Sequence, residues 1–278
     1  MKSRPTNTAL IYATLIAVSA LFVIPLIWMF CLSLKPLPEV FKQPPTFLPQ
    51  QPTPQAYQDV FRSEAFDFPL YARNTLIIAG LSLVGMLISC SIAAYGFARI
   101  PFRGRNVMFG VCLATMMIPF PVTMVPTYML FKQLGWIGTF LPLWVPAFFG
   151  SAFNIFLLRQ FFMGIPKELE ESAMLDGCSR WGCFWRIMLP LAKPALAVVA
   201  LFHVLSVWND LVGPLIYLSH QEQFTLALGL QFLVSRSGDT PWNQMMAAST
   251  LIVAPVVVLF LFAQRTFIRG IATTGIKG

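Results

Sequence analysis

The chain has 278 residues, of which 57% are hydrophobic and only 11% are charged, and its mean hydropathy is +0.71. This composition excludes an ordinary soluble domain and indicates an integral membrane protein. The net charge of +8 is therefore interpreted by its position relative to the membrane, and it does not predict a nucleic-acid partner.

Six apolar segments are long enough to be membrane-spanning helices, because a helix crosses the hydrocarbon core with about 20 residues. They lie at about residues 10–32, 74–98, 107–131, 138–158, 194–217 and 245–263. The first is too long for a signal-peptide core and lacks a small-residue cleavage site. The sequence thus predicts an all-α membrane protein with an N-terminal segment (1–9), a membrane domain (10–268) and a tail (269–278).

The segment between the first two spans, residues 34–73, is rich in proline and aromatic residues and carries charges of both signs. A loop of this length is usually either functional or a cap. Residues 57–62 within it are expected to form a short helix. In the second span, Gly85, Ser89 and Ala93 recur every four residues, and this small-residue stripe favours close approach of another helix.

The third and fourth spans are interrupted by prolines, and prolines at membrane depth leave backbone groups that neighbouring helices or a wet cavity must satisfy. These prolines are Pro119, Pro121, Pro126, Pro142 and Pro146. Such prolines are typical of helices that line a translocation path, and they are equally typical of helices that are simply kinked.

The basic residues predict the orientation of the chain. Of the 19 Lys and Arg residues, 13 lie in the N-terminus, the loops after the second and fourth spans, and the tail: Lys2, Arg4, Arg99, Arg103, Arg105, Arg159, Lys167, Arg180, Arg186, Lys193, Arg265, Arg269 and Lys277. Lys and Arg are retained on the cytoplasmic side of membrane proteins. Both termini and the loop at residues 165–190 are therefore expected in the cytoplasm.

That loop, residues 165–190, has the pattern of two short helices joined by a turn. Pro166 and three glutamates, Glu168, Glu170 and Glu171, are typical of a helix start. Gly177 then marks a helix end. A second helix is expected from Ser179, with an apolar face made of Trp181, Phe184, Trp185 and Met188. An amphipathic segment lying in the headgroups is the alternative, but three acids in one turn disfavour contact with a negative leaflet.

The titratable side chains exclude several classes of function. The only histidines are His203 and His220, and no Cys/His zinc cluster or nucleotide-binding P-loop is present. The sequence therefore predicts no catalytic residue, cofactor site or metal site in this chain. Any nucleotide energy must come from another chain.

Eight positions of the loop at 165–190 correspond to a known family motif. Glu171, Ser172 and Ala173, then Asp176 and Gly177, then Ile187, Leu189 and Pro190 keep the spacing of one known motif. They resemble the cytoplasmic EAA loop of ATP-binding-cassette importer permeases. The one departure is Ser172, which replaces the first alanine of the motif with another small residue.

Further motifs resemble the carbohydrate, or maltose-type, branch of those permeases: Asn74-Thr75-Leu76, Trp208-Asn209-Asp210, Met245-Met246-Ala247-Ala248-Ser249, Arg269-Gly270, Gly275 and Lys277-Gly278. The resemblance implies a type I importer permease fold with six spans in a bacterial or archaeal cytoplasmic membrane. It implies a second homologous permease subunit, a dimer of ATPase subunits carrying ATP and Mg²⁺, and an extracytoplasmic solute-binding protein. It also implies a role for each loop residue: Glu171 anchors the loop to the ATPase, Ala173 allows close approach and Gly177 makes the turn.

Asp210 and His203 are the only acidic, basic or histidine side chains inside a predicted span, and charge at membrane depth is a functional hypothesis by default. Trp208, Asn209 and Asp210 are therefore candidates for the substrate path, while Asp210 beside Gly213-Pro214 also fits a simple backbone cap. His203 fits helix packing better. An intramembrane enzyme acting on a lipid-linked sugar would need a cluster of such groups. A self-contained secondary transporter would show inverted repeats, and none is visible.

Overall fold

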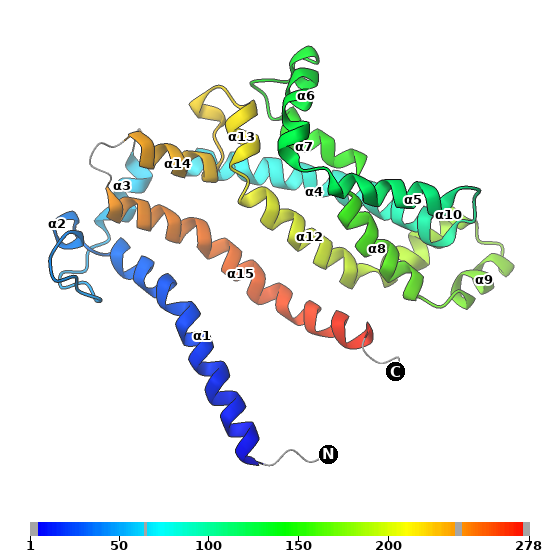
Figure 1. The fold of residues 1–278 in the computed structure, drawn as a ribbon, viewed down its shortest axis with the longest axis horizontal. Helices are drawn as coiled ribbons and strands as arrows, with labels where there is room; N and C mark the ends of the chain where they lie inside the picture. Colours follow the sequence, from blue (N-terminus) through cyan, green and yellow to red (C-terminus); the bar gives the residue numbers. More distant parts are fainter. Residues whose placement is uncertain (1–4, 64–65, 237–240, 275–278) are drawn as a thin grey trace. The chain divides into compact units, whose positions relative to one another are not determined.

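The computed structural model describes residues 5–63, 66–236 and 241–274, and every regular element in these ranges is helical (Figure 1). In chain order the elements are α1 (Pro5–Ser33), α2 (Leu37–Val40), α3 (Gln55–Arg62), α4 (Phe68–Arg99), α5 (Arg105–Ala114), η1 (Thr115–Met117), α6 (Phe120–Gln133), α7 (Leu141–Trp144), η2 (Val145–Phe149), α8 (Ala152–Gly164), α9 (Glu168–Leu175), α10 (Arg180–Cys183), η3 (Phe184–Met188), α11 (Leu189–Leu191), α12 (Lys193–Trp208), α13 (Val212–Tyr217), η4 (Gln221–Gln223), α14 (Leu226–Arg236) and α15 (Trp242–Thr274). The predicted all-α class is confirmed, in keeping with the need of a backbone in lipid to satisfy its own hydrogen bonds.

Four segments of the described chain are long and apolar enough to cross a membrane without a sharp bend: Thr8–Ser33, Phe68–Arg99, Leu141–Gly164 and Trp242–Gln264. They correspond to the predicted spans at 10–32, 74–98, 138–158 and 245–263. The first, second and last extend beyond the predicted ends, and the third starts and ends later than predicted.

The predicted spans at 107–131 and 194–217 are not continuous helices. Arg105–Met117 and Phe120–Gln133 meet at an angle of 98°. Pro119 lies at the break, and Ile118 before it is extended with ψ of 113°, because a residue that precedes proline disfavours the helical conformation. Helix α12 follows Arg180–Leu191 at a bend of 74° and ends at Trp208. The described residues thus contain four spans, or up to six if each bent pair crosses as one.

The chain forms two compact units, and the larger comprises Leu70–Leu228 and Val256–Gly278. Its core is a cluster of buried side chains from α4, α8, η3 and α12, which includes Met86, Tyr95, Leu158, Phe162, Phe184, Met188 and Val199. The predicted small-residue stripe on α4 faces η2: a side chain at Gly85 would collide with the Phe148 ring. The Ser89 hydroxyl donates to the Ala147 carbonyl at 3.0 Å. Because Phe184 and Met188 of the core cluster belong to the loop at 165–190, this loop is packed into the core of the membrane domain.

The smaller unit comprises Met1–Pro69 and Gly229–Pro255, and it contains most of the proline-rich segment. The expected short helix at 57–62 is confirmed as part of α3. Lys35 is 2% exposed, donates to the Thr46 carbonyl and lies 5.1 Å from the centre of the Trp28 ring. Glu39 is 8% exposed and accepts the Gln50 backbone N–H at 2.8 Å, and this hydrogen bond holds the pKa of the carboxyl below its ordinary value. This segment is folded around its own buried polar groups.

Candidate coupling site

Helix α9 carries the first part of the predicted loop motif. Glu168, Glu170 and Glu171 occupy its first turn, where carboxylates complement the positive end of the helix dipole. Consecutive residues of a helix point about 100° apart, so adjacent glutamates face different surroundings. Glu170 is 7% exposed, whereas Glu171 is exposed to solvent. The helix therefore has one side bound to the protein and one side free.

The end of α9 is a complete Schellman motif centred on Gly177. Gly177 has φ of +88°, in the left-handed region that glycine adopts without steric cost. Its N–H donates to the Met174 carbonyl at 3.1 Å, and the Cys178 N–H donates to the Ala173 carbonyl at 2.9 Å. The turn then leads to Ser179, whose hydroxyl accepts the Gly182 N–H at 3.1 Å and starts the next helix. The predicted helix–turn–helix is confirmed.

The second helix differs from the predicted apolar face. Phe184 and Met188 are fully buried in the core cluster, whereas Trp181 and Trp185 are 54% and 46% exposed. The four side chains spread over an arc of about 100°, and the membrane domain covers only half of it. The helix also widens into a π turn at Phe184–Met188. The apolar face expected from the sequence is therefore present, but the protein core covers only its Phe184 and Met188 and leaves the two tryptophans exposed.

The remaining motif residues lie where this helix joins α12. Leu189 packs against the core cluster, and Ile187 is partly buried. Pro190 is exposed and is the second residue of α11, which continues directly from the π turn at Phe184–Met188.

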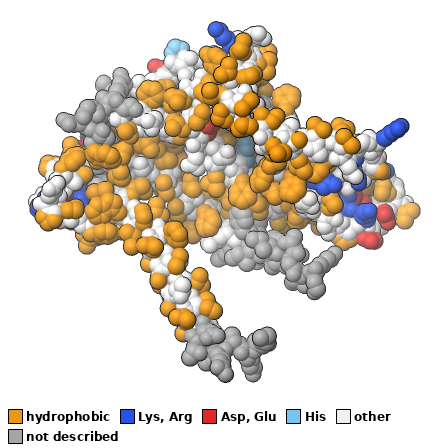
Figure 2. Space-filling model, in the orientation of Figure 1, with side chains coloured by type: hydrophobic (Ala, Val, Ile, Leu, Met, Phe, Trp, Pro, Cys, Tyr) orange, Lys and Arg blue, Asp and Glu red, His pale blue; other side chains and the backbone are white. Residues whose placement is uncertain are grey.

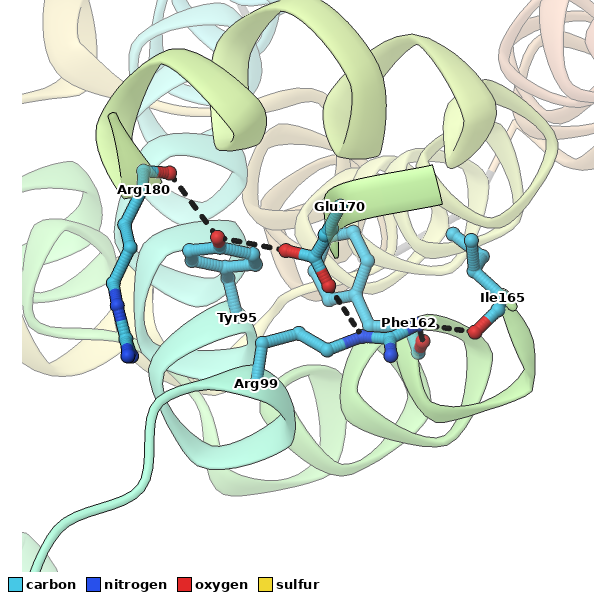
Figure 3. Close-up of polar contacts among 6 residues, drawn as sticks. All are labelled: Tyr95, Arg99, Phe162, Ile165, Glu170 and Arg180. Atoms are coloured by element: carbon cyan, nitrogen blue, oxygen red, sulfur yellow. Dashed lines mark hydrogen bonds and ion pairs between the residues drawn. The ribbon is translucent and has the colours of Figure 1, made fainter. Parts of the chain in front are cut away.

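A buried polar cluster, whose residues are not among the predicted site residues, fixes the inner side of α9 (Figure 3). Arg99, at the end of α4, places its Nε 3.2 Å from Glu170 Oε2, as an ion pair rather than an aligned hydrogen bond. The Tyr95 hydroxyl lies 2.9 Å from Glu170 Oε1 and 3.1 Å from the Arg180 carbonyl. The guanidinium also donates to the Phe162 and Ile165 carbonyls at the end of α8. One cluster therefore joins α4, α8, α9 and α10.

A signal for this cluster does exist in the sequence. Tyr95 and Arg99 are four residues apart and share one face of the last turns of α4. Their partner Glu170, however, is one of three glutamates in a single turn, and only the tertiary structure selects it.

The outer side of α9 is exposed and amphipathic. Glu171, Ser172, Asp176 and Gly177 are exposed, and Ala173 is partly exposed. Leu175 is 89% exposed, and an apolar side chain this accessible beside the two exposed tryptophans is typical of a surface that binds a partner. Figure 2 shows Lys, Arg, Asp and Glu side chains gathered over α5 and α9. Leu175 lies between the motif residues Ala173 and Asp176 and is not itself one of the predicted site residues.

The candidates for the substrate path lie at the break between α12 and α13. Trp208 is buried, and the Asn209 side chain donates to the Leu205 carbonyl at 2.8 Å. Asp210 Oδ1 accepts the Gly213 N–H at 3.1 Å, so the carboxylate caps the start of α13. The cavity that Asp210 lines has a volume of 20 Å³, enough for about one water molecule. The structure thus gives Asp210 a capping contact beside a cavity too small for a sugar.

A larger cavity lies one turn earlier on α12. It has a volume of 420 Å³ and is lined by Ser151, Phe153, Asn154, Phe202, His203 and Ser206, among others. His203 Nε2 lies 3.0 Å from the Ser82 hydroxyl, so this histidine joins α12 to α4, in line with the expected packing role. Hydroxyl, amide and aromatic groups in one cavity are suited to a polyhydroxy solute.

Comparison with known proteins identifies the family. Residues 85–273 match the family model described as the binding-protein-dependent transport system inner membrane component. The chain belongs to this family of importer permeases. It is a multi-pass inner-membrane transport subunit, and the resemblance noted in the sequence is confirmed.

Several relatives are similar to this chain over at least 92% of its length. The arabinooligosaccharides transport system permease protein AraQ of Halalkalibacterium halodurans is 32% identical, and the match covers 100% of this chain and 99% of AraQ. The diacetylchitobiose uptake system permease protein DasC of Streptomyces coelicolor is 32% identical over 92% of both chains. The trehalose/maltose transport system permease protein MalG of Thermococcus litoralis is 30% identical, over 97% of this chain and 96% of MalG.

Two solved structures share the fold. One is a bacterial ABC transporter involved in the import of the acidic polysaccharide alginate, with a TM-score of 0.82 and 24% identity over 95% of this chain and 98% of that chain. The other is a bacterial alginate ABC transporter in complex with a pentasaccharide-bound periplasmic protein, with a TM-score of 0.66 and 20% identity over 93% of both chains. The helical arrangement is therefore that of an importer permease. Of the tail motif predicted from the sequence, Gly275, Lys277 and Gly278 lie outside the residues that the structure describes.

Proposed function

We propose that this chain forms one half of the membrane pathway of an ATP-driven importer for an oligosaccharide or a related polyhydroxy solute, with a second permease subunit as the other half. The substrates named for the relatives, arabinooligosaccharides, diacetylchitobiose and trehalose/maltose, support the solute class. The cavity beside His203 and Asn154 supports it independently, since it offers hydrogen-bonding and aromatic groups within the membrane domain. Alternating access of the two halves would expose this pathway to one side at a time.

The two-sided construction of α9 is the observation that carries the proposed coupling to an ATPase. Its inner side is tied to α4 through Glu170 and Arg99, and its outer side presents Glu171 and Leu175. An element that transmits a movement has to be attached at one side and accessible at the other. In this proposal Glu171 binds the ATPase and Ala173 allows close contact. Asp176, Gly177, Ile187, Leu189 and Pro190 keep the loop in shape.

The proposal places six spans in a bacterial or archaeal cytoplasmic membrane, with both termini and residues 165–190 on the cytoplasmic side. The basic residues near α5 and α9 support this orientation. ATP and Mg²⁺ belong to the ATPase dimer, and an extracytoplasmic solute-binding protein delivers the solute. Trp208, Asn209 and Asp210 maintain the helix break beside the pathway.

The test compares Glu171→Lys with Glu168→Lys in the assembled transporter. Both variants reverse one exposed charge in the first turn of α9, so they share any effect on the helix dipole. Glu171→Lys is expected to abolish uptake and co-purification of the ATPase, while membrane insertion and the Glu168→Lys variant remain normal. Normal uptake by Glu171→Lys would refute the docking role of this side chain.

A further inference from the structure

A basic cavity lies beside the coupling loop, within the larger unit. It has a volume of 540 Å³ and is open on one side. Five cationic side chains line it: Arg99, Arg105, Arg159, Lys167 and Arg180. Only two carboxylates, those of Glu170 and Glu171, face them in the lining, so the cavity carries an excess of positive charge.

The buried ion pair accounts for only part of this charge. Arg99 and Glu170 neutralise each other. Arg105, Arg159, Lys167 and Arg180 form no ion pair with any residue that the structure describes, and Glu171 is the one carboxylate left in the lining. Like charges held this close repel one another unless an anion lies between them.

The Arg159 side chain lines the cavity and is held in place by two contacts. Its Nε donates to the Phe97 carbonyl at 3.3 Å, and its guanidinium lies 4.1 Å from the centre of the Phe109 ring. These contacts fix the stem and one face of the group. Its terminal amino groups make no hydrogen bond to the described part of the chain, and a guanidinium binds phosphate oxygens through such groups.

We propose that this cavity binds the phosphoryl headgroup of an anionic phospholipid, with Arg105 and Arg159 as its main ligands. The apolar surroundings favour a lipid over free phosphate. Helix α5 begins at Arg105 and continues with Val107, Met108 and Val111, which are 72%, 56% and 62% exposed. A headgroup in the cavity therefore leaves its acyl chains beside an apolar helix face. Basic pockets at the ends of membrane helices are known to bind such headgroups.

This inference goes beyond the proposed function and needs only the membrane location of the chain. A bound lipid would lie directly beside Glu171 and Met174 of α9, which line the same cavity. The lipid composition of the membrane would then modulate the coupling loop.

The experiment is native mass spectrometry of the full-length chain in detergent, titrated with phosphatidylglycerol or with phosphatidylcholine of the same acyl chains. Each basic group near a headgroup contributes about fivefold in affinity, so Arg105→Gln with Arg159→Gln is expected to weaken phosphatidylglycerol binding roughly 25-fold. Arg103→Gln removes the same kind of charge two residues away, from a side chain that does not line this cavity, and should leave binding unchanged. Should the double variant fail to fold, Arg105→Gln alone is expected to show the fivefold loss.

Three outcomes overturn the proposal. Equal phosphatidylglycerol affinity in all variants, or equal affinity for phosphatidylcholine, removes the headgroup site. Displacement of phosphatidylglycerol by millimolar inorganic phosphate assigns the cavity to a free phosphoryl anion. Loss of ATPase co-purification in the double variant with phosphatidylglycerol binding intact assigns it to a protein contact. Because lipid binding is measured on the chain alone, it stands or falls independently of the Glu171→Lys uptake test.

Discussion

Two polar regions of this chain each bury one carboxylate near one cation, and they differ in where the partners come from. Glu39 receives its hydrogen bonds from Thr46, Gln50 and Gln51, and Lys35 also lies within the same segment. Glu170 binds Tyr95 and Arg99, which lie on another helix more than 70 residues earlier. The hydrogen-bond partners of Glu39 thus come from its own segment, whereas Glu170 attaches α9 to the membrane helices. A movement applied to α9 must reach α4 and α8.

The most severe test of this comparison is to break the attachment of α9. Arg99→Met leaves Glu170 as an unpaired buried carboxylate, and we expect a loss of about 3 kcal/mol in the free energy of unfolding. Arg99→Met with Glu170→Met removes both charges and should recover much of that stability, as measured by denaturant unfolding in detergent. Uptake should stay low in the double variant, because the side chains that join the helices are gone. A double variant that transports normally would show that this cluster only stabilises the fold.

Substitution of Gly177 tests the conformational cost of the turn without a contribution from side-chain packing. A side chain there would meet open space, so the left-handed backbone is the only penalty. Gly177→Ala is expected to cost about 1 kcal/mol, and Gly177→Asn less, because asparagine tolerates this conformation. Thermal unfolding of the two variants measures the difference. Equal losses would mean that the turn is constrained by something other than its backbone.

The segment around Glu39 should respond to acid in a defined direction. Its hydrogen bonds lower the pKa of Glu39 from 4.5, so its stabilising contribution is complete above that value and is lost as the pH falls through the lowered pKa. Trp28 fluorescence, which senses the nearby Lys35, should therefore stay constant from pH 7 to pH 5 and change only in stronger acid. Glu39→Gln should remove that step. An unchanged acid transition in this variant would assign it to another group.

The smallest effect on stability is expected on the outer side of α9. Leu175→Ser alters a side chain that is 89% exposed, so the free energy of unfolding should change by less than about 0.5 kcal/mol. Co-purification of the ATPase should nevertheless decrease. Unchanged association would remove Leu175 from the docking surface.

The sequence predicted the elements that depend on local chemistry. The glutamate-rich start of α9, the glycine turn and the approximate positions of four spans follow from short-range rules. Helix contacts between distant segments were not predictable in this way. Glu170 rather than Glu171 is buried because it is the glutamate that meets Arg99. Phe184 is buried and the two tryptophans are exposed because the core covers only one part of their helix. The sequence shows every proline, but only the structure shows that the chain bends by 98° at Pro119.

The contacts of Arg99 also bear on how the membrane domain can move. One guanidinium holds the last carbonyls of α8, the carboxylate of α9 and the end of α4 at a single corner. Three helices joined in this way are expected to rotate as one rigid body, so spin labels at the ends of α4 and α8 should keep their separation throughout the transport cycle. The breaks at Ile118 and at Asn209-Asp210 lie outside this corner and are expected to act as hinges, so a disulfide or proline that stiffens either of them should stop transport without disturbing the corner.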